Sequence, residues 1–318
     1  MPGNAAKNQN AAKKGKSGMP RISVIILNWN GRKIIGNCLK SVFQQAVPPH
    51  EVIVVDNGST DGSQEFVKTR FRQARLVELK ANKGFAEGNN QGIRKASSDW
   101  VFVLNNDAVL DKDCLKKIGH EILKDKKTGD SEKVGMYSTN MVYMDTNRVD
   151  SLGLAISKLG LSHDIKEESN IHKLKGPCGG AAIYSRKMLE SLKDANGYYD
   201  RDFFIYFEDA DLAWRASREG WKCRLAKDAI VHHMHGETTR KMKDPFLFFF
   251  IRNRVLSFKK NNELGLIGLL LFLALQKIVL IKYLFKGKFF LAFSAIIEGF
   301  SGILSQPKEI FLRYGKSS

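Results

Sequence analysis

The sequence predicts an α/β protein built on a doubly wound, mostly parallel sheet, with an apolar helical segment at its C-terminal end. Strand-like and helix-like segments alternate over the first hundred residues, which is the pattern of a parallel sheet covered by helices on both faces. Residues 100–104, Trp-Val-Phe-Val-Leu, are continuously apolar, as expected of a strand that is buried on both faces. Residues 264–304 contain two long apolar runs that predict membrane-associated helices.

Each element of the alternation has its own signal. Four strands are expected where aliphatic residues cluster, at residues 21–27, 51–55, 75–79 and 100–104. Helical patterns lie between them, near residues 32–46, 62–72 and 86–97. Later segments predict a β-rich insertion or acceptor-side loop at 140–175, a short helix at 209–220 and a strand at 221–231. The chain lacks a Gly-x-Gly-x-x-Gly sequence after its first strand and a Gly-Lys-Ser/Thr loop, so the usual dinucleotide and P-loop signals are absent.

The C-terminal apolar runs are open to three interpretations. Residues 264–275 are uncharged, Gln276 and Lys277 follow, and the second run, 289–304, contains Glu298. Neither run is a clean span of about 20 apolar residues. They could form interfacial or re-entrant helices, a tilted transmembrane hairpin, or a pair of buried helices in a soluble core.

The net charge of +18 is concentrated at the two ends of the chain. Residues 1–21 carry five basic residues and no acid, and residues 240–318 carry 14 basic residues against four acidic ones. Basic charge mixed with apolar residues indicates an anionic membrane surface as a partner, rather than nucleic acid. We therefore divide the chain into a disordered basic tail (1–20), a catalytic domain (21–240) and basic, apolar membrane-associated helices (241–318).

Two features bear on the compartment. The four cysteines form no Cys-x-x-Cys pair, which argues against a zinc ribbon or a redox motif and fits a reducing compartment; they are Cys38, Cys114, Cys178 and Cys223. The first 18 residues lack an apolar core segment, which is typical of a disordered tail rather than a signal peptide.

Polar residues follow the predicted strand at 100–104. Asn105, Asn106 and Asp107 come at its carboxyl end, where open α/β sheets bind ligands. A carboxylate beside two amides can hold a divalent cation and a ribose, although a plain turn has the same composition. A second acidic cluster, with Glu208 and Asp209, comes about a hundred residues later. Two such clusters fit a metal-bound nucleotide on one side of a cleft and a general base on the other.

The second strand also ends in polar residues. Asp56 at its end could accept a hydrogen bond from the imide N–H of uracil or thymine. Asn57, Ser59 and the turn amides could hold a ribose or cap the next helix. For Thr60 and Asp61, simple helix capping is the favoured interpretation.

Six motifs, in this order, resemble those of the family 2 glycosyltransferases. They are SVIILNWNG (23–31), VVDNGSTDGS (54–63), NKGFAEGNNQGI (82–93), VLNND (103–107), GYYDRDFFIYFEDADLAWR (197–215) and AIVHH (229–233). The resemblance covers about residues 21–260 and is strongest to the rhamnosyltransferase-like branch, which builds bacterial and archaeal surface polysaccharides. It implies a GT-A fold, a nucleotide-sugar donor and an inverting, metal-dependent transfer.

The resemblance also implies nucleotide-binding positions. Asp56 matches the acid that contacts the base, and Asn106 matches a ribose-contacting position. Asp107 matches the last acid of a metal-binding Asp-x-Asp motif, from which this sequence departs by having Asn105. Two further groups match the nucleotide-facing end of the first strand and the segment along the diphosphate; they are Asn28 and Asn30, and Gly84, Asn89 and Asn90. For the second group a plain helix start is the alternative.

The remaining matches concern chemistry. Asp209 matches the catalytic base, and we expect Glu208 beside it to raise its pKa, because a like charge disfavours ionisation. His233 matches a metal-completing histidine, although His232 and His235 are close enough in sequence to compete. Oxygen ligands with one imidazole suit Mg²⁺ or Mn²⁺. Arg252 resembles an arginine that could bind a diphosphate, with a membrane-facing basic patch as the alternative.

The sequence thus predicts an inverting glycosyltransferase at the cytoplasmic face of the cell membrane. Its expected donor is a UDP- or dTDP-sugar, with rhamnose suggested by the branch, and its expected acceptor is a lipid-linked or glycan hydroxyl. A processive synthase is disfavoured because no Gln-x-x-Arg-Trp motif is present. The alternatives are a sugar-phosphate nucleotidyltransferase, which would need a Gly-rich start, and a membrane-docked scaffold with a degenerate nucleotide site.

Overall fold

The computed structural model describes residues 18–127, 133–234 and 244–315. A nine-stranded sheet forms its centre, in the order β3-β2-β1-β4-β11-β6-β12-β5, with β7 paired to β6. The strands of this sheet are β1 (Ile22–Asn28), β2 (Glu51–Asp56), β3 (Arg75–Glu78), β4 (Trp100–Asn105), β5 (Ala108–Leu110), β6 (Lys133–Tyr143), β7 (Val149–Ser151), β11 (Ala181–Ser185) and β12 (Trp221–His233). The predicted basic tail lies largely outside the described residues.

The first half of the sheet is parallel and the second half is mixed. β1 pairs in parallel with β2 and β4, and β2 pairs in parallel with β3, as the alternating sequence predicts. β11 runs antiparallel to both β4 and β6, and β5 runs antiparallel to β12. The predicted α/β class with a doubly wound sheet is confirmed, but the sheet is less uniformly parallel than expected.

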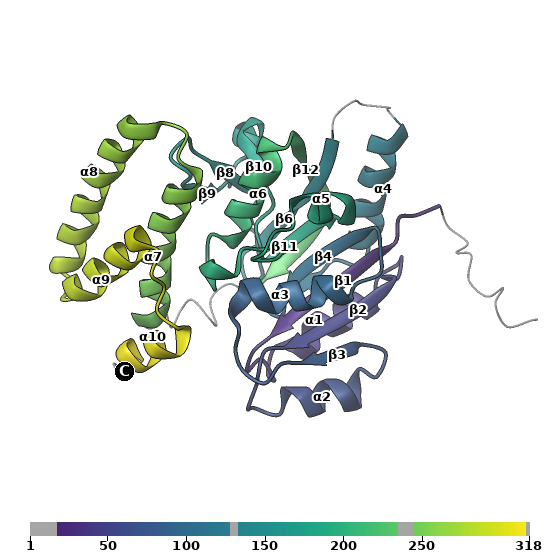
Figure 1. Ribbon diagram of the computed structural model, residues 1–318. Coiled ribbons are helices and arrows are strands. Elements are labelled where there is room, and N and C mark those ends of the chain that lie inside the picture. The colour runs from purple at the N-terminus through teal and green to yellow at the C-terminus, as the bar shows by residue number, and fades with distance from the viewer. Residues whose placement is uncertain (1–17, 128–132, 235–243, 316–318) are drawn as a thin grey trace, which may run out of the picture.

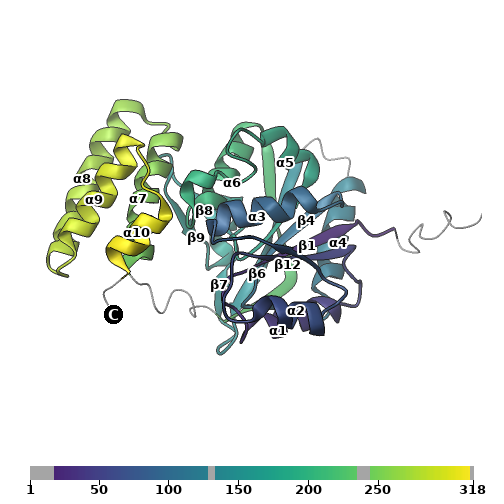
Figure 2. The same cartoon turned by 60° about the horizontal axis from the view of Figure 1, so that its bottom comes forward.

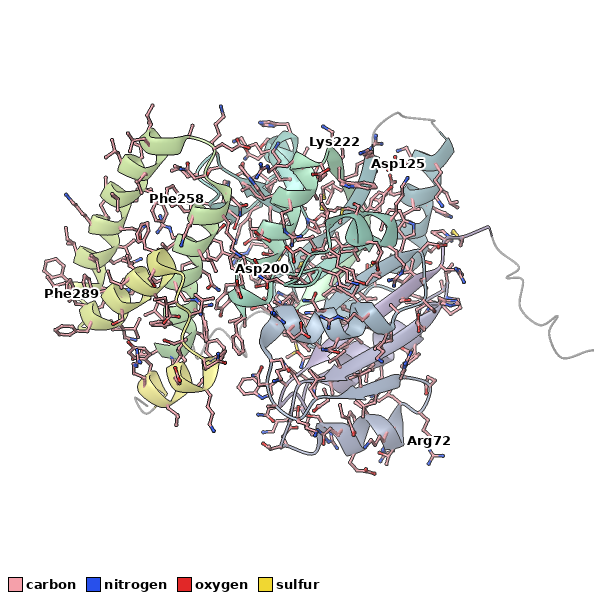
Figure 3. The ribbon with its side chains drawn as sticks, in the orientation of Figure 1. Arg72, Asp125, Asp200, Lys222, Phe258 and Phe289 are labelled. Carbon is pink, nitrogen blue, oxygen red and sulfur yellow. The ribbon has the colours of Figure 1, made fainter. Side chains whose placement is uncertain are left out.

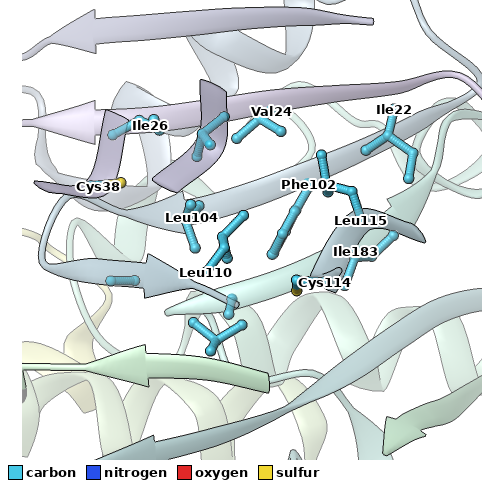
Figure 4. Close-up of a cluster of buried hydrophobic side chains, with 14 of the residues drawn as sticks. Ile22, Val24, Ile26, Cys38, Phe102, Leu104, Leu110, Cys114, Leu115 and Ile183 are labelled. Atoms are coloured by element: carbon cyan, nitrogen blue, oxygen red, sulfur yellow. The ribbon is translucent and has the colours of Figure 1, made fainter. Parts of the chain in front are cut away.

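Helices cover both faces of the sheet (Figure 1). One face packs against α1 (Ile35–Phe43), α2 (Ser63–Arg70) and α4 (Cys114–Lys127). The other packs against α3 (Gly84–Lys95), α5 (Arg186–Leu192) and α6 (Glu208–Arg218). Residues of β1 and β4 alternate between the two cores, so Val24 and Phe102 meet α1 and α4 while Ile25 and Val103 meet α3. Figure 4 shows the first of these cores.

The segment between β6 and β11 is rich in short strands, as the sequence predicts. β10 (Leu174–Gly176), β8 (Leu154–Ile156) and β9 (Ser162–Asp164) form a separate three-stranded sheet. Two short 3₁₀ turns complete the part of the chain before residue 235: η1 (Glu168–Lys173) and η2 (Arg201–Phe203).

Four helices follow and form a group on one side of the sheet (Figures 1 and 2). They are α7 (Asp244–Asn261), α8 (Gly265–Leu284), α9 (Phe289–Ser301) and α10 (Pro307–Tyr314). α7 lies between the sheet and the outer helices, and Phe248, Phe249 and Val255 in it are fully buried. Phe204, from the loop before α6, belongs to the same apolar cluster as α7 and α9. The helical group therefore shares a core with the sheet-containing part.

α8 is exposed although it is strongly apolar. Within the described residues, it is the one helix long and apolar enough to cross a membrane, by length and composition, and 17% of its most apolar window is buried. That small fraction contradicts a buried soluble-core role for α8. α9 has 13 residues and would reach about 20 Å, short of the roughly 30 Å hydrocarbon core. The described helices thus do not supply two membrane-spanning lengths.

Figure 3 shows how the side chains of this group are arranged. Phe289 lies at its outer edge, away from the sheet, whereas Asp200 lies where the sheet-containing part meets the helices. Lys260 of α7 forms an ion pair with Asp200 at that junction.

Candidate active site

Three strand ends meet at one edge of the sheet. The parallel register places Asn28 of β1 beside Asp56 of β2, and Leu27 beside Asn105 of β4. Asn28 Nδ2 donates to Asp56 Oδ2 (3.2 Å), and Asn106 Nδ2 donates to Asn28 Oδ1 (2.9 Å). The structure therefore brings together three of the residues that the sequence predicts to bind a nucleotide.

Gly31 lies directly against this polar cluster. A Cβ atom at that position would be 2.3 Å from both Asn106 Nδ2 and Asn28 Oδ1. Any side chain there would push the two amides apart, so this close approach requires glycine.

The Asp56 side chain is buried and fixed by hydrogen bonds. It is 1% exposed, and Oδ1 accepts hydrogen bonds from Ser59 N (2.9 Å) and Gln64 Nε2 (2.7 Å). Gln64 carries no motif signal and was missed on sequence. With Asn28 on Oδ2, one lone pair of Oδ2 remains for a base. Asn30, at φ 50°, joins the two turns, because its Oδ1 accepts from Thr60 N (2.8 Å).

Asn57 does not have the role expected for it. Its amide donates to Asn82 Oδ1 (3.0 Å) and the Gly84 carbonyl (3.1 Å), and its Oδ1 accepts from Lys83 N (2.8 Å). Both N–H groups are thus used to fix the loop before α3. The side chain shapes the site rather than supplying a donor to a ribose.

The start of α3 also differs from the expectation. Gly84 has φ 82° and packs against Phe204, whose carbonyl accepts from Phe85 N (2.6 Å) and Ala86 N (3.2 Å). A diphosphate cannot use these amides while that carbonyl occupies them. The assignment of Gly84 to the diphosphate is therefore corrected: it allows the Phe204 backbone to cap α3.

Asn90 is structural in the same way. Its Oδ1 accepts from Tyr199 N (2.9 Å) and its Nδ2 donates to the Tyr199 carbonyl (2.8 Å), in a fully buried position. Asn89 is also buried; its Nδ2 donates to the Phe85 carbonyl (3.0 Å), while its Oδ1 has no hydrogen-bond partner among the described residues. Both side chains are thus buried, and the hydrogen bonds of Asn90 connect α3 to the loop that contains Tyr199.

Asp107 and His233 face each other where β5 pairs with β12, just after the end of β4. β5 pairs with β12 so that Ala108 lies beside His233, and this places Asp107 Oδ1 3.3 Å from His233 Nε2. His233 Nδ1 lies 2.9 Å from Asp150 Oδ2, a contact that no sequence motif indicates. His232 points elsewhere and pairs with Asp111 (2.9 Å), and His235 lies outside the described residues.

The electrostatics of this group follow from its two acids. Burial on its own lowers the pKa of His233, but the interactions with Asp107 and Asp150 outweigh it and raise the pKa to about 9. A carboxylate oxygen facing an imidazole nitrogen is a donor pair that Mg²⁺ or Mn²⁺ accepts. No group of three or more His, Cys, Asp or Glu side chains suited to a metal occurs in the described part of the chain.

The second acidic cluster begins α6. Asp209 Oδ2 accepts from Gly179 N (2.8 Å), and Asp209 Oδ1 accepts from Ala210 N (2.7 Å). Gly180 next to Gly179 accepts from Asn105 N (2.9 Å) through its carbonyl. The strand end that leads to Asp107 and the helix start that carries Asp209 are therefore joined through two adjacent glycines.

Burial is the main reason for the raised pKa of Asp209, which is about 6; the charge of Asp164 adds to it, and the hydrogen bonds from Gly179 and Ala210 oppose it. The expected cause was Glu208. Instead, burial and the charge of Asp209 raise the pKa of Glu208 well above its usual value. Burial therefore disfavours the ionised form of both neighbouring carboxyl groups.

Asp211 and Arg215 form an ion pair within α6. Arg215 Nε lies 2.8 Å from Asp211 Oδ2, and its other nitrogens donate to the Leu192 and Tyr198 carbonyls. This pair secures α6 to the loop before it.

Arg252 was expected to bind a diphosphate or to face a membrane, and it does neither. It is 1% exposed and donates through Nη2 to the Asp202 (2.8 Å) and Phe203 (3.1 Å) carbonyls. Nη1 lies 3.3 Å from Glu298 Oε1 in α9. The side chain is an internal link between α7, α9 and the loop before α6.

The family model for glycosyl transferase family 2 matches residues 23–193. The chain belongs to this family. It is 24% identical over 262 residues to the low-salt glycan biosynthesis hexosyltransferase Agl10 of Haloferax volcanii, covering 78% of each chain. It is 25% identical over 219 residues to a poly-beta-1,6-N-acetyl-D-glucosamine synthase of Staphylococcus epidermidis, where it covers 68% of this chain but spans only half the length of that relative.

Solved structures show the same fold at low identity. The mannosyltransferase PcManGT from Pyrobaculum calidifontis, in complex with GDP-Man and Mn²⁺, matches with a TM-score of 0.54 at 18% identity, over 93% of this chain and 79% of its own. Staphylococcus aureus TarS matches with a TM-score of 0.54 at 19% identity, over 74% of this chain and 39% of its own. The GT-A fold that the motifs imply is thereby confirmed.

Proposed function

We propose that this glycosyltransferase inverts the donor's anomeric carbon and transfers a sugar from a UDP- or dTDP-sugar to a lipid-linked or glycan hydroxyl. The observation that carries this proposal is Asp209, a carboxylate with a raised pKa fixed by two backbone amides beside the polar strand ends. The hexosyltransferase and synthase named among the relatives support sugar transfer in glycan synthesis. Rhamnose follows from the motif resemblance alone.

Asp209 would act as the general base. The acceptor oxygen attacks the anomeric carbon, the bond to the diphosphate breaks, and the hydroxyl proton passes to an Asp209 oxygen. A pKa of about 6 leaves the carboxylate ionised at neutral pH and still basic enough to accept that proton. The raised pKa of Glu208 disfavours a second negative charge near the attacking oxygen.

The nucleotide would bind at the edge formed by β1, β2 and β4. The remaining Oδ2 lone pair of Asp56 suits the imide N–H of uracil or thymine, and Asn106 suits a ribose hydroxyl. Asn28 and Asn30 would act through the turns that they hold together.

Asp107 and His233 would hold Mg²⁺ or Mn²⁺ together with the donor diphosphate. They fit because a carboxylate oxygen and an imidazole nitrogen already face each other, and Asp150 orients the ring from its other nitrogen. When bound, the ion supplies positive charge to the departing diphosphate. Mn²⁺ in the PcManGT complex is in keeping with this assignment.

The exposed face of α8 would bind the cytoplasmic leaflet. Its outward apolar residues include Leu266, Ile267 and Leu270, which are 72%, 68% and 61% exposed. Lys277, Lys282 and Lys286 lie on the same helix or just after it, and this mixture suits an anionic bilayer. A helix lying in the interface agrees better with the short α9 than a spanning hairpin does.

The two alternative functions, a sugar-phosphate nucleotidyltransferase and a non-catalytic scaffold, have less support. Family membership does not fit a sugar-phosphate nucleotidyltransferase. A non-catalytic scaffold would have no use for a buried carboxylate held at a raised pKa.

The test is release of nucleoside diphosphate from a panel of UDP- and dTDP-sugars, with anionic vesicles and Mn²⁺ or EDTA. We expect at least one donor to be turned over, EDTA to stop the reaction, and Asp209→Asn to lower turnover by about 10²–10⁴-fold while still binding UDP. Turnover of no donor would favour the scaffold. Near-normal turnover by Asp209→Asn would move the base to another residue.

A further inference from the structure

The segment that leads into α6 has an unusual backbone. Phe204, Tyr206 and Phe207 have φ values of 64°, 72° and 72°. Residues with a Cβ rarely adopt positive φ, and bulky aromatic residues do so least readily. Three such residues within four positions persist only where the surrounding structure holds them. Glu208 and Asp209 follow directly, so whatever fixes this segment also fixes the two carboxyl groups.

One side chain of α7 contacts most of this segment. Asn253 Nδ2 lies within hydrogen-bond distance of the Phe203 (2.6 Å), Ile205 (2.7 Å) and Tyr206 (3.0 Å) carbonyls. Asn253 is fully buried, so its amide is directed at these carbonyls rather than at water. The amide thus takes the place of water at three carbonyl groups of the strained segment.

Arg252 orients this amide. Its Nε donates to Asn253 Oδ1 (2.8 Å), which leaves the Asn253 NH₂ group pointing at the loop. Its Nη2 donates to the Asp202 and Phe203 carbonyls, and Nη1 pairs with Glu298. Glu298 Oε2 in turn accepts from Ser305 Oγ (2.8 Å). The planar guanidinium of Arg252 supplies several N–H donors in a fixed fork, and a side chain without that group would not supply them.

We propose that Asn253, oriented by Arg252, is a positioning residue that holds residues 203–207 in the conformation that places Glu208 and Asp209 in the active site. The proposal rests on the proposed function for its catalytic consequence. Asp209 is fixed on one side by Gly179, and this segment would fix it on the other. Loss of the Asn253 donors should therefore lower turnover without touching the nucleotide edge of the sheet.

Three variants test it. Asn253→Ala removes the donors, and Arg252→Lys keeps a charge opposite Glu298 but loses the fork. Ser257→Ala is the matched control: Ser257 is fully buried one turn further along α7, and its Oγ donates to the Gly160 carbonyl (2.6 Å), away from the segment. Hydrogen–deuterium exchange of peptides covering 199–212, kcat, the KM for the donor and UDP affinity are measured on each, with thermal unfolding alongside.

We expect faster exchange at 199–212 in Asn253→Ala and Arg252→Lys, and a fall in kcat of about 10²-fold or more in Asn253→Ala. The KM for the donor and the UDP affinity should stay as in the parent, and Ser257→Ala should match the parent in exchange and kcat. Should Asn253→Ala fail to fold, Arg252→Lys supplies the comparison.

Two results would overturn the proposal. One is unchanged exchange at 199–212 in the folded variants; the other is faster exchange with an unchanged kcat. A parent that turns over no donor would instead sink the proposed function, and the exchange data would still decide whether Asn253 and Arg252 hold the segment.

Discussion

Adjacent side chains on a strand point to opposite faces, and this alternation separates the two neighbouring histidines of β12. His233 faces Asp107 and Asp150, whereas His232 pairs with Asp111. Spacing in the sequence could not choose between them. The pairing of β12 with β5 makes the choice, because Ala108 lies beside His233 and Asp107 precedes it.

This arrangement predicts the metal dependence of UDP binding. Asp107→Ala should abolish the gain in UDP affinity that Mn²⁺ gives the parent, because it removes a carboxylate ligand, and His233→Ala should reduce that gain by less. His232→Ala is the control and should behave as the parent. Isothermal titration of UDP with and without Mn²⁺ measures the gain. Equal gains in Asp107→Ala and the parent would disprove the assignment.

The raised pKa of Asp209 has a cost in stability. The folded state holds the proton up to about pH 6, whereas the unfolded chain releases it near pH 4, so the free energy of unfolding falls as pH rises through that interval. Asp209→Asn, which carries no charge, should be more stable than the parent at pH 7 by on the order of 2–3 kcal/mol. Urea unfolding at pH 7 and at pH 4 checks this, and the advantage should disappear at pH 4. An equal stability at pH 7 would mean that burial does not raise this pKa.

The grouping of residues at strand ends was predictable from the sequence, whereas the partners of residues in α3 were not. Asn28, Asp56 and Asn106 could be grouped from sequence because the carboxyl ends of parallel strands meet at one edge. Gly84 and Asn90 were assigned wrongly because their partners, Phe204 and Tyr199, lie more than a hundred residues away. The role predicted for Arg252 was wrong for the same reason, because its carbonyl partners come from a distant loop.

At the level of elements, local patterns identified the first four strands and the helices between them. The direction of β11 and β5 escaped prediction because it depends on long-range pairing rather than on apolar periodicity. The C-terminal runs gave three alternatives because composition does not reveal which side of a helix is covered. Contacts with α7 cover one side of α9 and leave α8 largely exposed.

α8 offers a direct test of membrane binding. Replacing Ile267, Leu270, Ile278 and Ile281 with Gln should release the protein from anionic vesicles, because these side chains are between 55% and 68% exposed and would lose their burial in the bilayer. Changing Lys277, Lys282 and Lys286 to Gln should weaken binding by about 1 kcal/mol per lysine and make it insensitive to salt. Vesicle sedimentation measures both. Unchanged sedimentation of the first variant would instead indicate a protein partner for this face.

At the level of the whole molecule, the shared core decides whether the sheet-containing part and the C-terminal helices can fold separately. Phe204 belongs to the cluster formed by α7 and α9, and Lys260 reaches Asp200 across the junction. The predicted boundary at 240/241 lies outside the described residues, but these contacts cross it. A truncation after residue 260 would strip α9 from α7, so that a well-folded, soluble shortened chain is not expected.

Thermal unfolding in a mild detergent should therefore show one transition. The four tryptophans are Trp29, Trp100, Trp214 and Trp221, so fluorescence reports on the sheet-containing part alone. Ellipticity at 222 nm reports on all the helices, including the C-terminal group. The two signals should change at the same temperature if the parts unfold together. Two separate midpoints would show that the C-terminal helices form an independent unit.

The link between Asn253 and the segment before α6 also sets an order of events during synthesis. The ribosome releases Phe203 to Asp209 long before Asn253, which lies 50 residues later, and Glu298, which completes the Arg252 arrangement, emerges 46 residues after Arg252. Until then the segment lacks the donors of Asn253 and Arg252 and has only its contacts with earlier parts of the chain, such as those of Phe204 with α3. The nascent chain can thus complete the edge formed by β1, β2 and β4 before the segment that precedes Glu208 and Asp209 receives its full set of hydrogen bonds.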